Sequence, residues 1–376
     1  MKDFNLLKEE LYDIKSEIKE WSIYYDENNL YPIESIKKLK ELNLFNRLFI
    51  ENGYISFSIT ELEEVIQIIS SSCLSTGLIC GMHFQQIITI IKHSNLSKNH
   101  IINEILNPQL IIASVTSEYN KGGDINTFLN SLIWKDKLNF TLNRKAPTVT
   151  GGMYADAYLL ANKASEKEDK NTFIFFLKEE ATINKLSSWN ALGVRSTQSD
   201  AISITASLNK ENNLIFDESY DNILNQTFIP LGHILWSSAW LGCTKEAFKE
   251  GVKLIRENSN KKTDINLIRL SEVRRKIDLV TMYLKQINSE YLDNNDVSSR
   301  RIIHINDLKV ISSSLLFESA NILIDISGLA MGYQKNKYYL LEKYFRDLKS
   351  ASLMYNNDRL NEINGKLNLF DSNLLP

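Results

Sequence analysis

The chain has 376 residues and a formal net charge of −3 at pH 7. At roughly 150 residues per domain, this length predicts about two to three domains, which excludes a disulfide-stapled miniprotein and a single small binding module. A hydrophobic fraction of 43% and a charged fraction of 24% are typical of a folded globular protein and not of a disordered or collagen-like chain. Because basic residues are not in excess, we expect neither nucleic acid nor an anionic membrane as the main partner.

The cysteines and the start of the chain bear on its location. Cys73, Cys80 and Cys243 form neither a C-x-x-C pair nor an even set, which favours a reducing cytoplasm. The charged, amphipathic start does not resemble a secretory signal. The run Val65–Ile91 has no charged residue and could span a bilayer by its length, but its Ser, Thr, Gln and His side chains would lack partners in lipid. This run therefore predicts a buried or interface helix.

The first part of the chain shows helical spacing. Apolar residues three or four positions apart predict a long amphipathic helix from Phe4 to Trp21. A second helix is expected after Pro32, over residues 33–44, and the charge-free run supplies one or two more. The chain is therefore predicted to be helical to about residue 110.

From Leu110 the pattern changes to short β-rich runs separated by Gly, Asn, Asp and Lys clusters. The expected strands are 110–115, 131–134, 138–142, 156–161, 172–177 and 201–206. Past residue 220 helical spacing returns, most clearly over Val273–Tyr291. The sequence thus predicts an α+β protein with a helical domain over residues 1–112, a β domain over 113–218 and a helical bundle over 219–376.

Four segments near the junctions of these domains carry a resemblance to a known family. They are Ile112–Glu118 with Gly122–Asp124, Val149–Asp156, Leu192–Ser199, and Asp325–Tyr333 with Leu341–Asp347. They resemble motifs of the acyl-CoA dehydrogenase superfamily of flavoproteins. The first resembles its Thr-Glu-Pro turn with Gly-Ser-Asp, and the second resembles its strand and loop that pack on the flavin. The third resembles its Leu-Gly-x-Arg-x-Thr-x-Ser turn, and the fourth resembles its Gly-Gly-x-Gly-Tyr loop with the start of the last helix. Tyr119 replaces the Pro of the first motif. The resemblance extends over essentially the whole chain and implies a barrel-like β domain and a C-terminal four-helix bundle.

The resemblance also implies FAD, bound between the β domain and the bundle. The residues that it nominates for the cofactor are Val115, Thr116, Ser117, Thr148, Thr150, Arg195, Gly328 and Gly332. Backbone N–H groups near Val115–Ser117 and Thr150 would hydrogen-bond the pyrimidine edge of the flavin, and the two glycines would permit close approach of the dinucleotide. Considered singly, these glycines are equally compatible with simple helix ends. No metal site is predicted.

The base that a dehydrogenase needs is where the sequence departs from the family. Counting along the motifs places Tyr338 at one usual carboxylate position and Gly232, next to His233, at the other. His83 resembles a histidine near the flavin in the family's monooxygenase branch. The candidate catalytic residues are therefore His83, His233 and Tyr338. The alternative for each histidine is a satisfied core residue, and an ordinary tyrosine pKa of about 10 makes Tyr338 a poor base.

The expected function follows from this resemblance. The segment Glu257–Lys262 departs from the family's Arg-x-x-Phe-Gly and is similar to the branch found in polyketide and nonribosomal peptide pathways. We expect an FAD-dependent dehydrogenase that oxidises an acyl thioester, held on a carrier protein or coenzyme A, by hydride transfer to flavin N5. An electron-transfer acceptor or oxygen would take the electrons, and a homodimer or homotetramer is expected. The alternatives are oxidation of a 2-hydroxyacyl thioester, a two-component flavin monooxygenase of the same fold, and a catalytically silent scaffold.

Overall fold

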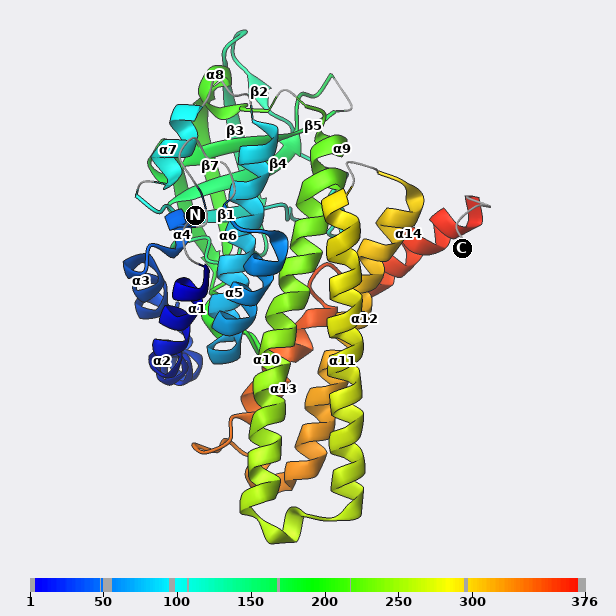
Figure 1. Ribbon diagram of the computed structural model, residues 1–376. Helices are drawn as coiled ribbons and strands as arrows, with labels where there is room; N and C mark the ends of the chain where they lie inside the picture. Colours follow the sequence, from blue (N-terminus) through cyan, green and yellow to red (C-terminus); the bar gives the residue numbers. More distant parts are fainter. Residues whose placement is uncertain are drawn as a thin grey trace.

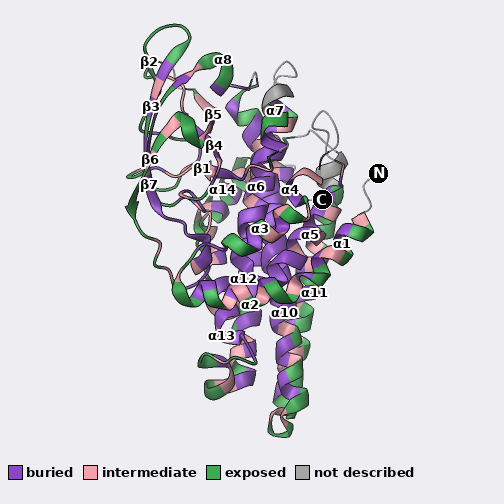
Figure 2. Ribbon diagram, turned by 90° about the vertical axis from the view of Figure 1, so that its left-hand side faces the viewer, coloured by how far each residue is buried: buried purple, intermediate pink, exposed green. Residues whose placement is uncertain are grey.

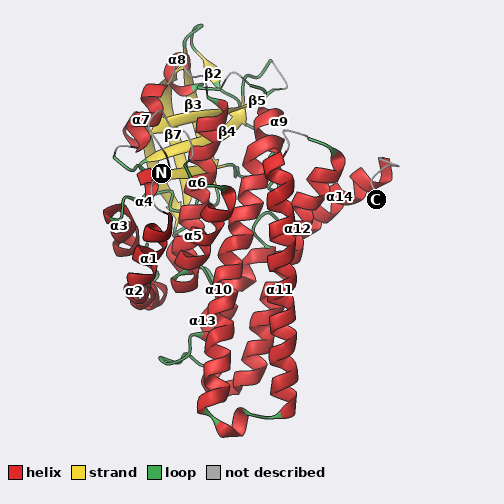
Figure 3. Cartoon of the chain, viewed as in Figure 1, coloured by secondary structure: helices red, strands yellow, loops and turns green. Residues whose placement is uncertain are grey.

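The structure is a computed structural model and describes residues 4–47, 49, 56–94, 99–106, 108–167, 170–216, 218–293 and 297–370. The strands gather at one end of the molecule, and helices fill the rest (Figures 1 and 3). The helices are α1 (Phe4–Asp13), α2 (Lys15–Asn28), α3 (Ile33–Glu41), α4 (Leu44–Arg47), α5 (Ile59–Ser72), α6 (Leu74–His93), α7 (Asn99–Leu106), α8 (Lys210–Asn213), α9 (Tyr220–Ile223), α10 (Ile229–Glu257), α11 (Asp264–Asp293), α12 (Ser299–Gly328), α13 (Leu341–Lys349) and α14 (Asn357–Phe370). The strands are β1 (Ile112–Val115), β2 (Ile133–Trp134), β3 (Asn139–Ala146), β4 (Ala157–Lys163), β5 (Asn171–Leu177), β6 (Ala181–Ser187) and β7 (Ala201–Asn209).

The helix expected from Phe4 to Trp21 is in fact two helices. α1 and α2 meet at Ile14, which flanks α2 without a side-chain cap. Leu7 and Leu11 on α1 and Ile18 on α2 are all buried. Because both helices keep the predicted apolar stripe on the core, the spacing of apolar residues could not reveal the break.

The charge-free run forms the paired helices α5 and α6. α5 begins with a capping box, in which the Ser58 side chain accepts from the Glu61 N–H and the Glu61 carboxylate accepts from the Ser58 N–H at 2.7 Å. The Cys73 sulfur caps α6 by accepting from the Thr76 N–H. By length and composition α6 and the helix over Ser299–Tyr333 could each cross a membrane, but almost all of α6 is buried inside the protein. The expectation of a buried helix is therefore met at α6.

The strands form two sheets, with orders β1-β4-β5 and β2-β3-β7-β6. β1 and β4 are parallel, with Ile112 opposite Ala157, and β4 and β5 are antiparallel. A separate apolar core, which includes Val115 and Ile202, packs between strands of both sheets. β6 was not predicted, because most of its residues are exposed and its sequence lacks apolar alternation.

The long helices α10, α11 and α12 lie side by side and extend well beyond the N-terminal helices (Figure 1). α10 follows a π-helical turn, Leu224–Phe228. It packs tightly on α5 at Gly242, where a Cβ atom would overlap the Gln67 carbonyl oxygen. A glycine is needed there because the two backbones approach so closely.

One continuous apolar core joins the N-terminal helices, the first sheet and the bundle (Figure 2). Leu39 of α3, Phe173 of β5 and Trp240 of α10 all belong to it. The two helical segments of the chain therefore stabilise each other directly, and the β segment is fixed against both.

We expect the stability of this core to depend on pH through Glu63 of α5. Glu63 is 4% exposed, and burial raises its pKa from 4.5 to about 8. The pKa of Glu63 is higher in the folded state than in the unfolded state. Its contribution to the free energy of unfolding is therefore fully present below pH 4.5 and is lost as the pH rises towards 8. Glu63→Gln should therefore leave the free energy of unfolding almost unchanged at pH 4.5 and raise it at pH 8.5, by roughly 2 to 4 kcal/mol at about 1.36 kcal/mol per pKa unit.

Urea unfolding at several pH values measures this difference. The neighbouring Glu64→Gln is the control, because the Glu64 side chain is 39% exposed. A Glu63→Gln variant whose stability follows that of the parent protein at every pH would show that Glu63 is not held in its protonated form.

Candidate functional site

A cavity of about 540 Å³ lies where the three segments of the chain meet. One wall comes from β1 and the loops that follow β1 and β3. A second comes from the turn before β7, around residues 189–194, together with α13. The third comes from α6, the start of α10 and the segment between α13 and α14. This volume is in the range of cavities that enclose small-molecule ligands and cofactors.

The β-domain wall carries polar groups that are open to a ligand. Thr116, Ser117, Thr148 and Thr150 line it. The Ser117 hydroxyl donates to the Thr148 carbonyl oxygen at 2.8 Å, and the hydroxyl oxygens of Thr150 and Ser199 are 3.1 Å apart. The backbone N–H groups of Thr116, Ser117 and Thr150 have no acceptor on the described part of the chain. A ligand with acceptor atoms would satisfy these donors.

The other residues nominated for the cofactor lie elsewhere. Val115 is buried in the core between the sheets. Arg195 turns away from the cavity, and its Nε donates to the Asp26 carbonyl oxygen at 2.8 Å. Gly328 ends α12 with a φ of 74°, and Gly332 belongs to a π-helical turn beside it, near the α10–α11 connection. The structure thus brings Thr116, Ser117, Thr148 and Thr150 together on one wall of the cavity. The cofactor-binding role of all eight nominated residues stays a prediction.

The turn around Gly193 is held against α13. A Cβ atom on Gly193 would overlap the Arg346 carbonyl oxygen, so only glycine allows this contact. The next residue, Val194, has a left-handed backbone with a φ of 46°, and its N–H donates to Asp347 Oδ1 at 2.6 Å. Gly193, Val194 and Arg346 all line the cavity, so α13 fixes the shape of this wall.

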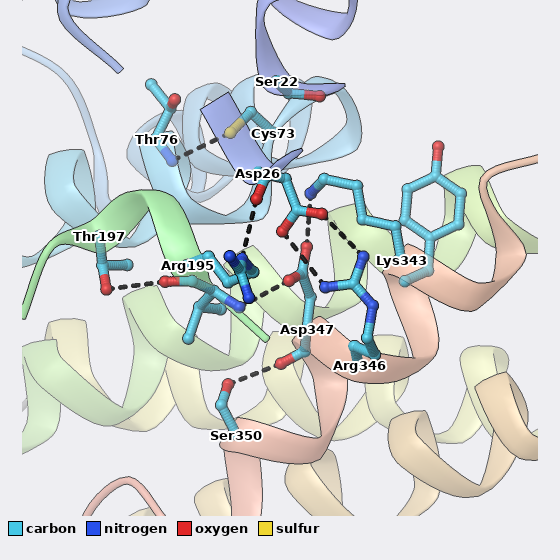
Figure 4. Close-up of polar contacts among 12 residues, drawn as sticks. Ser22, Asp26, Cys73, Thr76, Arg195, Thr197, Lys343, Arg346, Asp347 and Ser350 are labelled. Atoms are coloured by element: carbon cyan, nitrogen blue, oxygen red, sulfur yellow. Dashed lines mark hydrogen bonds and ion pairs between the residues drawn. The ribbon is translucent and has the colours of Figure 1, made fainter. Parts of the chain in front are cut away.

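A cluster of charged side chains joins α2, this turn and α13 (Figure 4). Lys343 Nζ donates to Asp347 at 2.7 Å, and both residues are buried. Arg346 donates to Asp26 at 2.7 Å and to Glu342 at 2.6 Å. Burial opposes the charge on Lys343, but the Asp347 carboxylate raises the pKa of Lys343 above its usual range. The pair is therefore charged, and it ties the cavity wall to the bundle.

The helical wall is mostly apolar and includes Leu78 and Met82 of α6, Phe228, and Trp236 of α10. Gly232 stands one turn before Trp236, at a position where the family resemblance implies a carboxylate. Here the Gln85 side chain takes the available space, because a Cβ atom on Gly232 would lie 2.6 Å from Gln85 Nε2. Gln85 Nε2 donates to the Phe228 carbonyl oxygen at 2.5 Å. A neutral amide thus stands in this part of the wall.

Tyr355, which the sequence analysis missed, lines the cavity from the segment between α13 and α14. Its backbone is left-handed, with a φ of 51°, which is costly for a non-glycine residue. Its hydroxyl has no hydrogen-bond partner on the described part of the chain. Burial raises the pKa of Tyr355 well above its usual range, so the hydroxyl is a proton-bearing donor at neutral pH. The adjacent Asn356-Asn357 pair is the turn signal that could have indicated this segment.

None of the three candidate bases lines the cavity. His83 is buried, and its Nδ1 accepts from the Ile112 N–H at 3.2 Å. His233 is also buried, with Nδ1 at 3.2 Å from the Ile305 carbonyl oxygen. Burial lowers the pKa of each histidine to about 3. Tyr338 lies on the surface and is 66% exposed. The structure does not bring these three residues together, and their catalytic role stays a prediction.

Comparison with solved structures shows which fold this is. Butyryl-CoA dehydrogenase from Megasphaera elsdenii is similar over 97% of this chain and 98% of its own, with a TM-score of 0.85 and 14% sequence identity. The dibenzothiophene monooxygenase TdsC from Paenibacillus sp. A11-2, in its FMN-bound form, is similar over 97% of this chain and 96% of its own, with a TM-score of 0.83 and 15% identity. XiaF from Streptomyces sp., in complex with FADH2 and glycerol, is similar over 99% of this chain and 97% of its own chain, with a TM-score of 0.80 and 15% identity.

The chain therefore has the acyl-CoA dehydrogenase fold, as the resemblance implied, and the α+β architecture with a C-terminal helical bundle is confirmed. This fold is found both in a dehydrogenase and in a monooxygenase. The sequence matches no protein-family model, and comparison with curated protein sequences gives no match.

Proposed function

We propose that this protein is a flavin-dependent oxidoreductase whose cavity holds the flavin ring. The unpaired N–H groups of Thr116, Ser117 and Thr150 support this proposal, because they offer donors to the acceptor-rich edge of a flavin without a charged side chain. When bound, a flavin supplies two-electron chemistry, either by accepting hydride or, once reduced, by reacting with oxygen. FAD is the expected form, and the solved structures of this fold include one with FMN and one with FADH2.

Between the two reactions, the cavity favours a monooxygenase that receives reduced flavin from a separate reductase. This choice rests on which charged side chains line the cavity. Among the described residues, the cavity is lined by no carboxylate and no imidazole, and its charged side chains are Arg346 and Lys349. Removal of an α proton from an acyl thioester needs a base within reach of the substrate. Insertion of an oxygen atom from a reduced flavin does not require such a base in the cavity.

This chain's own residues would contribute binding, orientation and exclusion of water. The Tyr355 hydroxyl can donate a hydrogen bond to a substrate oxygen or nitrogen, since its raised pKa keeps it protonated. Phe228 and Trp236 supply apolar surface that excludes water from the reacting atoms. The charged cluster around Asp347 holds the wall formed by residues 189–194 and α13 in place.

The two reactions are separated by anaerobic spectroscopy followed by oxygenation. We expect the flavin-loaded protein to remain oxidised when acyl thioesters of coenzyme A or of a carrier protein are added without oxygen. We expect the protein loaded with reduced flavin to transfer one oxygen atom to a substrate after air is admitted, which mass spectrometry detects. Anaerobic bleaching of the flavin by any acyl thioester would instead establish the dehydrogenase.

One observation favours that dehydrogenase as the second candidate. A smaller cavity of about 160 Å³ adjoins the first at Tyr355 and includes Arg301 and Arg359 in its lining. An extended thioester arm could enter through it, past Arg301 and past Arg359, which pairs with Asp124 of the same lining at 2.7 Å. We therefore keep oxidation of an acyl thioester on a carrier protein or coenzyme A, with transfer of electrons to an electron-transfer acceptor or oxygen, as the alternative.

We also propose a homodimer or homotetramer in the cytoplasm. Several large apolar side chains are more than half exposed in the bundle. They include Ile265 and Ile268 at the start of α11, and Leu329 and Tyr333 in the π-helical turn that follows α12. Contact with another copy would bury them. Light scattering should give at least twice the monomer mass of 43.3 kDa.

A further inference from the structure

The helix α14 forms one wall of the smaller cavity without packing closely on the bundle. Arg359, Leu360, Ile363 and Leu367 of α14 line that cavity of about 160 Å³. A second hollow, of about 330 Å³, lies between α14 and Ser299 at the start of α12 and shares Ile363 and Leu367 with the first. These two apolar side chains on the inner face of α14 therefore border hollows, where a tightly packed helix would meet other side chains.

Little apolar surface holds α14 in place. Of its fourteen residues only Leu360 and Asn364 are buried, whereas most residues of α10 are buried. Figure 1 shows α14 extending sideways from α12, with its C-terminal end clear of the long helices. Leu369 and Phe370 near this end are 77% and 83% exposed. Moving α14 away from α12 would therefore expose little further apolar surface, so the hydrophobic cost of that movement is small.

Hydrogen bonds between polar side chains attach α14 to α12. Asn306 Nδ2 donates to Asn364 Oδ1 at 2.8 Å, and Asn364 Nδ2 donates to Asp307 Oδ1 at 2.8 Å. At the start of α14, Lys309 Nζ donates to Asn357 Oδ1 at 2.7 Å. Water can replace each partner when the helices separate, so each bond stabilises the closed position by only about 0.5 to 1.5 kcal/mol.

Lys309 makes the closed position of α14 less favourable. It is fully buried, and no carboxylate among the described residues pairs with it. Burial lowers the pKa of Lys309 to about 7, because the ammonium loses its hydration without gaining a counter-charge. Its hydrogen-bond partner is the first residue of α14, so movement of this turn would let water reach the amine.

The chain has a turn before α14 and an ion pair within it. Tyr355, two residues before α14, has a left-handed backbone with a φ of 51°. Positions at the ends of elements commonly absorb the rotation of a hinged segment. Arg359 Nη2 lies 2.7 Å from Asp124 Oδ1 and joins α14 to the loop that follows β1. Both side chains are partly exposed, so this pair contributes no more than about 1 kcal/mol.

We propose that α14 is a lid over the smaller cavity, hinged at Tyr355 and latched by the Asp124–Arg359 ion pair, and that a ligand enters the cavity beneath it. Tyr355 lines both cavities, so the open lid gives access to the side of the larger cavity where this hydroxyl lies. The inference goes beyond the proposed function, because the movement of α14 does not depend on a flavin.

A cysteine placed beneath α14 reports the opening. Ile305 of α12 lines the smaller cavity and is 3% exposed, and the three native cysteines are buried. Labelling of Ile305→Cys by methyl methanethiosulfonate, followed by mass spectrometry, should proceed at a rate proportional to the open fraction. Adding Arg359→Met should raise this rate about three- to fivefold. Adding Asn364→Ala should raise it at least about tenfold, since two hydrogen bonds are lost while alanine keeps α14 helical.

The matched control is Glu362→Gln, added to Ile305→Cys. The pair of Glu362 with Lys366 lies within α14 and is mostly exposed, so the labelling rate should change by less than about twofold. Equal labelling rates with Asn364→Ala and with Glu362→Gln would overturn the proposal. Low concentrations of urea should leave the labelling rate of Ile305→Cys almost unchanged, because opening exposes little surface. A rate that rises with urea as global unfolding does would also overturn the proposal.

Hydrogen exchange of the unsubstituted chain is a second measurement that needs no variant. We expect the amide protons of α14 to be at least about tenfold less protected than those of α12. Equal protection of the two helices would overturn the lid. Neither measurement uses a flavin, so a failure of flavin binding would overturn the proposed function and leave this inference standing.

Discussion

Asp347→Asn is expected to cost about 3 to 5 kcal/mol of unfolding free energy, the usual range when one partner of a buried ion pair is removed. Asp347 is fully buried and accepts hydrogen bonds from Lys343 Nζ and from the Val194 N–H. Asparagine keeps the size and one acceptor oxygen, but it leaves the buried Lys343 ammonium without a counter-charge. Because Val194 lines the cavity, flavin affinity should fall together with stability.

A second substitution separates charge from packing in this cluster. In the double variant Lys343→Met with Asp347→Asn no unpaired charge remains, so at least half of the lost stability should return. The surface control is Asp278→Asn, whose pair with Arg274 is about half exposed, and it should change stability by less than about 1 kcal/mol. Chemical unfolding followed by circular dichroism measures all three. A double variant that is no more stable than Asp347→Asn would contradict the importance of the unpaired lysine.

Gly193→Ala is the second change with a large expected effect. Its Cβ atom would overlap the backbone of Arg346 and Asp347 in α13, where no flexible side chain can move aside. We expect a loss of about 2 to 3 kcal/mol, near the upper part of the range for overpacking, and displacement of the turn from α13. Since Gly193, Val194 and Arg346 all line the cavity, flavin binding should weaken by at least about tenfold, which corresponds to 1.4 kcal/mol.

Gly365→Ala is the matched control for this prediction. It places the same methyl group in α14, where nothing lies within 4 Å of the added Cβ atom. Alanine favours a helix over glycine by about 1 kcal/mol, so this variant should be as stable as the parent or slightly more so. If Gly193→Ala unfolded at the same denaturant concentration as Gly365→Ala, the close contact between the turn and α13 would be wrong.

Sequence periodicity and motif order were sufficient for the fold but not for every element. The helical stripe that contains Leu7, Leu11 and Ile18 predicted helix correctly, yet its spacing continues through the break at Ile14. β6 escaped prediction because an exposed edge strand has no need for alternating apolar residues. The spacing of apolar residues predicts an element only when one face of that element is buried. It gives no signal for an element without a buried face.

The same distinction explains the site. Thr116, Ser117 and Thr150 could be nominated because they lie in two short motifs that carry the family resemblance, and Thr148 directly precedes the second motif. Gln85 and Trp236 could not, because their place in the wall depends on the glycine at position 232 and on the π-helical turn before α10. His83 looked like a catalytic residue in the sequence, whereas the structure places its imidazole against the Ile112 N–H. Contacts between segments far apart in the chain decide these cases.

The most direct test of the flavin cavity is a fluorescence titration of the protein with FMN and FAD, each in its oxidised and its reduced form. We predict binding of one flavin per chain that Thr150→Phe weakens by at least about tenfold, by filling the space beside its N–H. Thr182→Phe, on the exposed face of β6, should bind as the parent does. Failure of both flavins to bind in both redox states, or an unchanged affinity in a folded Thr150→Phe variant, would contradict the assignment of this cavity to a flavin.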